Sequence, residues 1–311
     1  MSLGVRREQV AVIIVNYRTA ALTAAAVDSV LRSTGVDIHV VLVDNASGDD
    51  SVECLRRRFH DNPAVTLLVR DRNDGFAGGN NAGFEVARGR GVRFALLLNS
   101  DTLIDEDCVC RLLAEADRDP ATALACPRIV FGDRPDLLWF GGARFSMWRG
   151  RPIHVGLSEP VDRGWTEPSD LPFASGCALL VRLGAVPGPL FDQSLFSYAE
   201  DLDLSLRLRR MGHRIRFVPD GRVLHFEGAS HRRAGGQALR VYLNTRNVMR
   251  VAARHARWYH WSTLAPALLI DLLGRYAAIA VRDRDPGSFA AVWRGALDAV
   301  TGGRHAIERT R

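Results

Sequence analysis

The stretch Leu96-Leu97-Leu98-Asn99-Ser100-Asp101-Thr102 decides the fold class of this 311-residue chain, because an apolar run ends abruptly in a polar cluster with a carboxylate at its tip. Continuous Val, Ile and Leu is typical of a parallel strand that is buried on both faces. Ligands of open α/β sheets bind beyond the carboxyl ends of such strands. Asp101 is therefore placed where a metal or a phosphate would bind, although an Asp here can also start a turn or cap a helix.

The same pattern recurs through the first third of the chain. We expect strands at residues 10–15, 39–43, 65–69 and 94–98, and helices at residues 20–33, 51–59 and 81–88. Strands that alternate with helices at this spacing predict βαβ units and a parallel sheet. The polar residues again follow the strands, so the polar tips are expected at the carboxyl ends.

The regularity changes beyond residue 105. We expect a helix at about 107–117, strand-like pieces near 124 and at 126–131, and then a Gly-, Pro- and Trp-rich segment up to Pro172. That segment is more typical of a substrate-covering insertion than of a repeating α/β unit. Further strands are expected at 178–181 and 222–224, a helix at 201–211, and a largely helical region from Gly235 onward.

Composition and charge narrow the class of protein. Charged residues make up 24% and hydrophobic residues 47% of the chain, which are ordinary values for a folded protein. The net charge of +6 is unevenly placed, so we expect no nucleic acid partner. The five cysteines lack paired spacing, and neither a secretory signal nor an apolar run of about 18 residues is present. We therefore expect reduced thiols and a cytoplasmic protein.

Several motifs occur in a fixed order along the chain. They are Val12-Ile13-Ile14-Val15-Asn16-Tyr17, Val43-Asp44-Asn45-Ala46-Ser47, the Gly- and Asn-rich residues 73–83, Leu98-Asn99-Ser100-Asp101, Ala174-Ser175-Gly176-Cys177-Ala178, Phe191-Asp192, Tyr198-Ala199-Glu200-Asp201-Leu202-Asp203-Leu204 and Val223-Leu224-His225. Over residues 10–230 the chain thereby resembles the inverting family 2 glycosyltransferases, and most closely their bacterial rhamnosyltransferase-like branch.

This resemblance implies an α/β fold of the GT-A type, which is Rossmann-like, with a mixed, mainly parallel sheet flanked by helices and a C-terminal helical extension. It divides the chain into a nucleotide-sugar-binding half at residues 1–125, an acceptor-binding and catalytic half at residues 126–232, and the helical extension at residues 233–311.

The resemblance also implies a donor site for a dTDP- or UDP-sugar. In it, Asp44 accepts a hydrogen bond from the N3–H of the pyrimidine and Tyr17 lies against the ring. Glycines at residues 73–83 would let backbone N–H groups approach the donor. The expected donor-binding residues are Val15, Asn16, Tyr17, Asp44, Asn73, Gly78, Asn80, Ser100 and Asp101. Two alternatives stay open, namely that Asp44 forms an Asx-turn or a helix cap, and that residues 73–83 are a flexible turn.

A metal site is implied at the fourth strand tip. Asp101 matches the last acid of the D-x-D signature of the family, which binds a divalent metal across the two donor phosphates. Mg²⁺ and Mn²⁺ prefer oxygen ligands, and the expected cofactor is one of these ions. Asn99 stands in place of the first acid, so the protein supplies the metal with one carboxylate fewer. His225 matches a histidine that completes such sites, although a lone His is often structural.

Glu200 and Asp201 are the candidates for acid–base chemistry. An inverting transfer needs one carboxylate that removes the proton of the acceptor hydroxyl. By resemblance Asp201 is that base, and Glu200 helps to hold the acceptor together with Gly176 and Tyr198. The alternative is that these acids only stabilise the first turn of the following helix.

The C-terminal region combines basic and aromatic residues. A row of arginines with near-helical spacing precedes three aromatic residues: Arg246, Arg250, Arg254 and Arg257, followed by Trp258, Tyr259 and Trp261. The next segment, from about residue 264 to 282, would form a helix with a polar and an apolar face. The polar face holds Asp271, Arg275 and Arg282, and the apolar face holds Leu268, Leu269, Leu272, Leu273 and Tyr276. This pattern suits a helix in a membrane interface, at the inner face of the cell membrane. It equally suits a helical pair packed on the catalytic part or in a homodimer.

The sequence thus predicts a glycosyltransferase that moves a sugar, with L-rhamnose from dTDP first, to a glycan, lipid-linked or small-molecule acceptor in cell-surface polysaccharide assembly. One alternative is a transferase that tailors a soluble secondary metabolite. Another is a non-catalytic nucleotide-sugar or glycan-binding protein. A Rossmann dehydrogenase is excluded because no G-x-G-x-x-G follows the first strand.

Overall fold

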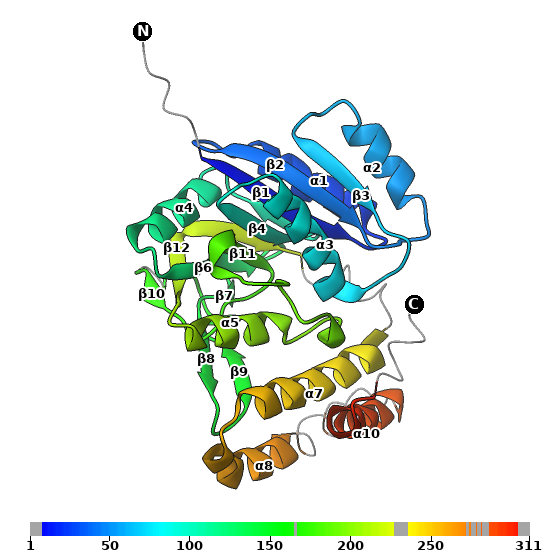
Figure 1. The fold of residues 1–311 in the computed structure, drawn as a ribbon, viewed down its shortest axis with the longest axis vertical. Helices are drawn as coiled ribbons and strands as arrows, with labels where there is room; N and C mark the ends of the chain where they lie inside the picture. Colours follow the sequence, from blue (N-terminus) through cyan, green and yellow to red (C-terminus); the bar gives the residue numbers. More distant parts are fainter. Residues whose placement is uncertain are drawn as a thin grey trace.

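The computed structural model describes residues 8–164, 167–226, 236–271, 274, 278, 281 and 286–303. The elements in chain order are β1 (Gln9–Asn16), α1 (Ala20–Leu31), β2 (Asp37–Asp44), α2 (Ser51–Phe59), β3 (Val65–Val69), α3 (Gly75–Gly89), β4 (Phe94–Asn99), β5 (Thr102–Ile104), α4 (Cys108–Arg118), β6 (Thr122–Phe131), β7 (Leu138–Phe140), β8 (Ala143–Ser146), β9 (Arg151–His154), β10 (Ser169–Asp170), β11 (Ala178–Arg182), α5 (Glu200–Arg210), β12 (Arg214–His225), α7 (Gly236–His255), α8 (Trp261–Ile270) and α10 (Pro286–Thr301) (Figure 1).

One mixed, mainly parallel sheet forms the centre of the protein. Its strand order is β10-β12-β6-β11-β4-β1-β2-β3, with β5 paired to β12 and β7 paired to β6. Strands β1 to β4 are parallel, and β11 is antiparallel to both β4 and β6. Because β12 is parallel to β6, the strands β4, β6 and β12 all point the same way. The fold class expected from the sequence is confirmed.

This topology gathers the polar strand tips at one edge of the sheet. The register pairs Asn16 with Asp44, and Val15 with Asn99. β12 ends at His225 on the same side, and the reversed strand β11 starts there, just after Gly176. We call this the site edge and define it by Asn16, Asp44, Asn99, Gly176 and His225.

The hydrophobic core lies on both faces of the central strands. Residues 10–14 of β1 and residues 94–97 of β4 are fully buried, as a parallel strand between two helical layers requires. Burial of each Val, Ile, Leu or Phe side chain among them contributes about 1.5–3 kcal/mol relative to exposure. The rigid centre therefore supports the site edge.

Helix α3 begins at Gly75, so the expectation of a loop up to residue 81 is wrong. The glycines of this segment let the helix pack closely on β1. A Cβ atom at Gly79 would lie 2.7 Å from Cγ1 of Val15, and one at Gly83 would lie 2.4 Å from Cγ2 of Ile13. Close packing of a helix against a strand thus explains these two glycines.

The segment up to Pro172 is more regular than its composition suggests. It contains β7, the two-stranded β8–β9 sheet and β10, which pairs with β12. Strand β12 is also longer than the expected residues 222–224. A register shift between Val218 and Arg222 sets three residues, Pro219, Asp220 and Gly221, outside the ladder, and these residues interrupt the apolar pattern that marks a strand.

The C-terminal extension is helical in its described residues, and α7 lies between α5 and α10 (Figure 1). The predicted row of arginines is partly turned into the protein, whereas Arg254 and Arg257 are exposed. Arg246 is fully buried, and Arg250 donates to the carbonyls of Asp298 and Gly303. The arginines of this helix therefore mostly hold the protein together. Leu272, Leu273, Arg275, Tyr276 and Arg282 lie outside the described residues.

In the part of the chain that the structure describes, no helix has the length and apolar content to cross a membrane.

Candidate active site

The tips of β1 and β2 form a fully buried polar cluster. Asp44 Oδ2 accepts hydrogen bonds from Asn16 Nδ2 at 2.7 Å and from Ser47 Oγ at 2.6 Å, and its Oδ1 accepts from the Ser47 amide at 3.1 Å. Asn16 Oδ1 accepts a bond of 2.7 Å from the Thr23 hydroxyl. These contacts match the turn-forming alternative for Asp44, and its contact with a nucleotide base stays a prediction.

Tyr17 and Arg18 lie beside this cluster and are more accessible. The Arg18 guanidinium lies 5.0 Å from the centre of the Tyr17 ring, and Arg18 Nε donates to the Ser47 carbonyl at 2.8 Å. Arg18 has a φ of 58°, a conformation that costs free energy in a residue with a side chain. Sequence reasoning missed Arg18, whose place after the aromatic residue is the one signal that marks it.

The N-terminus of α3 is held by side chains from the preceding loop. Asn73 Oδ1 accepts from the Gly75 amide at 2.9 Å and from Asn45 Nδ2 at 2.9 Å. Asp74 is 4% exposed and forms ion pairs with Arg70 and Arg72. This loop therefore keeps the first turn of the helix in place at the site edge.

Gly78 and Asn80 lie inside the helix and not in a ligand-facing loop, which corrects the expected backbone geometry. Asn80 is 1% exposed and donates to the Phe76 carbonyl at 2.9 Å. A Cβ at Gly78 would lie 2.3 Å from Cβ of Asp74. Their contact with a donor stays a prediction. Asn81, which the sequence reasoning did not single out, binds both the amide and the carbonyl of Phe191 at 2.8 Å.

Asp101 and His225 come together at the site edge, as the sequence predicts. His225 Nε2 lies 3.4 Å from Asp101 Oδ1, and both side chains are about 95% buried. The Trp139 ring packs edge-on against His225 with the ring centres 4.6 Å apart. Ser100 lies beside them and its hydroxyl contacts that of Thr19 at 3.3 Å. Burial lowers the pKa of His225, but Cys177 and the Asp101 carboxylate act in the opposite direction and raise it to about 11.

The donor set at this point fits a divalent cation, with few protein ligands. Asn99, two residues before Asp101, has a buried Oδ1 that lacks a hydrogen-bond partner, and such an oxygen is a type of ligand that a divalent cation accepts. Among the described residues, His, Cys, Asp and Glu nowhere form a group of three that could hold a metal ion. Asp101, His225 and Asn99 thus form a small set that would need oxygens of a ligand or of water to complete a shell.

Glu200 and Asp201 begin helix α5, and a strained turn precedes them. Phe196, Tyr198 and Ala199 have φ values of 66°, 71° and 63°. The Asp201 carboxylate accepts from the amides of Gly176 at 2.9 Å and Leu202 at 2.7 Å. The predicted acceptor residues Gly176, Tyr198 and Glu200 are therefore neighbours of Asp201.

The two acids have different electrostatic surroundings. Burial and the charge of Asp201 raise the pKa of Glu200 well above its usual value, and Glu200 Oε2 lacks a hydrogen-bond partner. Burial also raises the pKa of Asp201, although the Gly176 and Leu202 amides act in the opposite direction. Asp201 ionises first, because amides of two other residues, Gly176 and Leu202, stabilise its anion, whereas Glu200 has only its own amide and also faces the charge of Asp201. The pair can therefore supply one carboxylate and one neutral carboxyl group.

The backbone joins the metal candidates to the acids. The Asn99 amide donates to the Cys177 carbonyl at 2.9 Å. The amide of Gly176, the residue before Cys177, donates to the Asp201 carboxylate. The backbone of residues 176–177 thus links Asn99 at the end of β4 to Asp201 at the start of α5.

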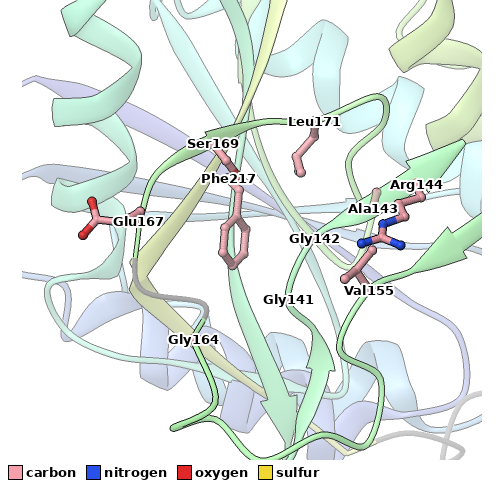
Figure 2. Close-up of a pocket in the computed structure, with 10 residues that line it drawn as sticks. All are labelled: Gly141, Gly142, Ala143, Arg144, Val155, Gly164, Glu167, Ser169, Leu171 and Phe217. Atoms are coloured by element: carbon pink, nitrogen blue, oxygen red, sulfur yellow. The ribbon is translucent and has the colours of Figure 1, made fainter.

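A separate pocket of about 420 Å³ lies away from these acids. It is lined by residues of the 141–144 segment, Val155, Gly164, Glu167, Ser169, Leu171 and Phe217 (Figure 2). Neither Glu200 nor Asp201 is among the residues that line it. The pocket is therefore not the site of the acid pair.

Comparison with known proteins agrees with this geometry. The family described as "Glycosyl transferase family 2" matches residues 11–177. The chain is 30% identical over 255 residues to an N-acetylglucosaminyl-diphospho-decaprenol L-rhamnosyltransferase of Mycobacterium tuberculosis, an alignment that covers 74% of this chain and 80% of the relative.

Two solved structures share the fold. One is GalNAc-T7 with UDP, GalNAc and Mn²⁺, with a TM-score of 0.62 and 19% identity over 80% of this chain and 48% of that one. The other is the mannosyltransferase PcManGT of Pyrobaculum calidifontis with GDP-Man and Mn²⁺, with a TM-score of 0.58 and 16% identity over 96% of this chain and 89% of that one. The chain therefore belongs to glycosyl transferase family 2 and is a glycosyltransferase with the GT-A fold.

Proposed function

We propose that this enzyme transfers a sugar with inversion of the anomeric carbon, by a single displacement in which Asp201 is the general base. The observation that carries this proposal is the Asp201 carboxylate, held by two backbone amides at the start of α5 beside a second buried acid. One base within reach of the acceptor hydroxyl is all that a single displacement requires. The acceptor oxygen forms the new bond to the anomeric carbon, its proton passes to Asp201, and the nucleoside diphosphate leaves.

The residues at the tip of β4 would hold a divalent cation. Asp101, Asn99 and His225 supply the protein ligands, and the bound ion would offset the negative charge that develops on the departing diphosphate. His225 must give up its proton to act as a ligand, so binding of the metal is expected to release a proton.

The donor is proposed to be a dTDP- or UDP-sugar, and L-rhamnose is the first candidate for the sugar. Tyr17 with the neighbouring Arg18 offers an aromatic face and a cation near the tips of β1 and β2. The name of the mycobacterial relative supports rhamnose as the sugar. UDP with Mn²⁺ in one structural neighbour and GDP-Man with Mn²⁺ in the other support a donor that carries a nucleoside diphosphate.

The acceptor is proposed to be a lipid-linked sugar in cell-surface glycan assembly, with the protein bound peripherally to the inner face of the membrane. The name of the mycobacterial relative refers to an N-acetylglucosaminyl-diphospho-decaprenol acceptor. Exposed apolar side chains on one face of α10 support contact with lipid, since Phe289, Trp293, Leu297 and Val300 are between 47% and 80% exposed. Trp258, which follows α7, is 85% exposed, and Trp is enriched at membrane interfaces.

Sedimentation with vesicles that contain anionic lipid tests the membrane contact. We expect the protein to bind at low salt, and the W293S/L297S protein to bind several-fold less because this face loses its apolar side chains. The control is Met211→Ser, which removes an exposed apolar side chain elsewhere, at the end of α5. Absence of binding by the wild-type protein would favour a soluble acceptor, such as a secondary metabolite.

A transfer assay with a panel of nucleotide sugars tests the reaction itself. Thermal shifts with the same nucleotides, with and without Mn²⁺, identify the donor, because a ligand that binds only the native state raises the melting temperature. NMR of the product formed from the preferred donor then gives the configuration at its anomeric carbon. Retention of configuration would overturn the single displacement.

A further inference from the structure

The turn that precedes the acid pair receives its hydrogen bonds from two other helices. Three of its residues, Phe196, Tyr198 and Ala199, have the positive φ values that residues with a Cβ atom rarely adopt. Such conformations persist only where the surrounding structure holds them. The contacts of this turn therefore decide where Glu200 and Asp201 lie.

Five consecutive carbonyl groups, from Ser194 to Tyr198, accept hydrogen bonds from outside the turn. Helix α3 supplies one bond, from the Ala77 amide to the Phe196 carbonyl at 2.9 Å. Arg246 and Asn247 of α7 supply the others. Arg246 Nη2 donates to the carbonyls of Ser194 at 3.0 Å and Leu195 at 2.9 Å.

Asn247 makes the contacts closest to the acids. Its Nδ2 atom donates to the carbonyls of Leu195 at 2.8 Å, Ser197 at 2.7 Å and Tyr198 at 2.8 Å. Arg246 Nε donates to Asn247 Oδ1 at 2.8 Å, which orients the amide so that its NH₂ group faces the turn. Both residues are fully buried.

The same helix also holds α5 itself. Asp203 is fully buried and its Oδ1 contacts Arg254 Nη1 and His255 Nε2, both at 2.9 Å. Asp203 lies two residues after Asp201. Helix α7 therefore binds the turn before the acids through its Asn247. It binds α5 through Arg254 and His255, which contact Asp203.

We infer that Asn247 is a positioning residue for the transfer reaction, which fixes the strained turn and thereby sets the place of the Asp201 carboxylate. This inference rests on the proposed role of Asp201 as base. It assigns the C-terminal extension an indirect part in the reaction, because helix α7 would set the place of the base. A small displacement of a reacting group costs a large factor in rate, because the bond-forming atoms must be aligned.

The test compares Asn247→Ala with Asn244→Ala in the full-length enzyme. Asn244 lies one turn earlier on α7, and its Nδ2 donates to the Arg240 carbonyl of the same helix at 3.0 Å, its one hydrogen bond to the described residues. We expect Asn247→Ala to lower kcat by a factor of about 10–100 with the KM for the donor within twofold of wild type. Asn244→Ala is expected to keep both within twofold. Equal kcat values for the two variants would overturn the inference.

Hydrogen exchange supplies a readout that does not depend on activity. In Asn247→Ala, amides of residues 194–203 are expected to exchange at least tenfold faster than in Asn244→Ala, and unchanged exchange would count against the inference. If Asn247→Ala does not fold, Asn247→Ser keeps one donor and is compared with Asn244→Ser by the same two measurements. An active Asp201→Asn protein would instead refute the proposed base, whereas an inactive Asp201→Asn beside an unimpaired Asn247→Ala refutes this inference alone.

Discussion

The Gly176 amide donates a hydrogen bond of 2.9 Å to Oδ2 of Asp201, and so joins the start of β11 to the start of α5. This bond stabilises the carboxylate form of Asp201, while the neighbouring Glu200 has a buried oxygen without a partner. The two acids of one short motif therefore differ in their protonation, and each acid can be tested by its own amide substitution.

Replacement of the proposed base should remove most of the activity. Asp201→Asn keeps the shape of the side chain but cannot accept a proton, so we expect kcat to fall by a factor of about 10²–10⁴. Glu200→Gln imitates the neutral acid, so its kcat should stay within about tenfold of wild type. Steady-state kinetics of both proteins with saturating donor measure the difference, and a larger loss in Glu200→Gln would reverse the assignment.

The pH dependence of transfer follows from the direction of the Asp201 shift. Burial raises the pKa of Asp201 above its ordinary value of 3.8. Because the base must be ionised, kcat/KM should fall as the pH drops through this raised pKa, at a higher pH than for an exposed Asp. A profile of kcat/KM against pH checks this, and an acidic limb at or below 3.8 would contradict it.

Glu200→Gln should also stabilise the protein at neutral pH. The folded pKa of Glu200 lies well above its ordinary value of 4.5, so the wild-type protein loses stability as the pH rises from that ordinary value toward the folded pKa. Gln cannot ionise, so the Glu200→Gln protein does not lose stability in this pH range for that reason. Urea unfolding should give equal stabilities for the two proteins below pH 4.5 and a growing advantage of Glu200→Gln above it.

Two glycines of α3, Gly83 and Gly89, provide a matched pair of substitutions that tests how closely this helix packs on β1. Gly83→Ala places a Cβ atom 2.4 Å from Cγ2 of Ile13, whereas a Cβ at Gly89 meets nothing within 4 Å. We expect Gly83→Ala to lower the free energy of unfolding by about 1–3 kcal/mol through overpacking. Gly89→Ala, in the same helix, should be neutral or gain up to about 1 kcal/mol. Thermal unfolding distinguishes them, and similar values would contradict the close packing.

Asp203→Asn should be among the more destabilising substitutions in α5. Burial raises the pKa of Asp203, but contacts with His255, Arg254 and Arg207 outweigh it and lower the pKa below 3.8. Loss of the carboxylate leaves these groups without their counter-charge, at a cost of about 3–5 kcal/mol. Asp170→Asn, whose own side chain and whose partner Arg214 are both 47% exposed, should cost about 1 kcal/mol or less. Denaturant unfolding of both proteins measures the contrast.

Much of the fold and part of the site could be predicted from the sequence. The apolar run before Asn99 identifies a central strand, and motif order brings Asp101 together with His225, which the structure confirms. The helical spacing of Arg246, Arg250 and Arg254 predicted α7 but not which side of the helix is buried, because spacing alone does not tell a packed face from an exposed one. Asn247 could not be found, since it binds backbone carbonyls about fifty residues earlier, which leaves no mark in side-chain patterns.

The placement of β11 between β4 and β6 has a consequence for expression of fragments. A fragment that ended at residue 125 would contain β1 to β4, but it would expose the edge of β4 that β11 covers in the intact chain. Unpaired edges of long apolar strands promote association between chains. Such a fragment is therefore expected to aggregate, and residues 1–125 are better studied by substitutions in the intact protein than in isolation.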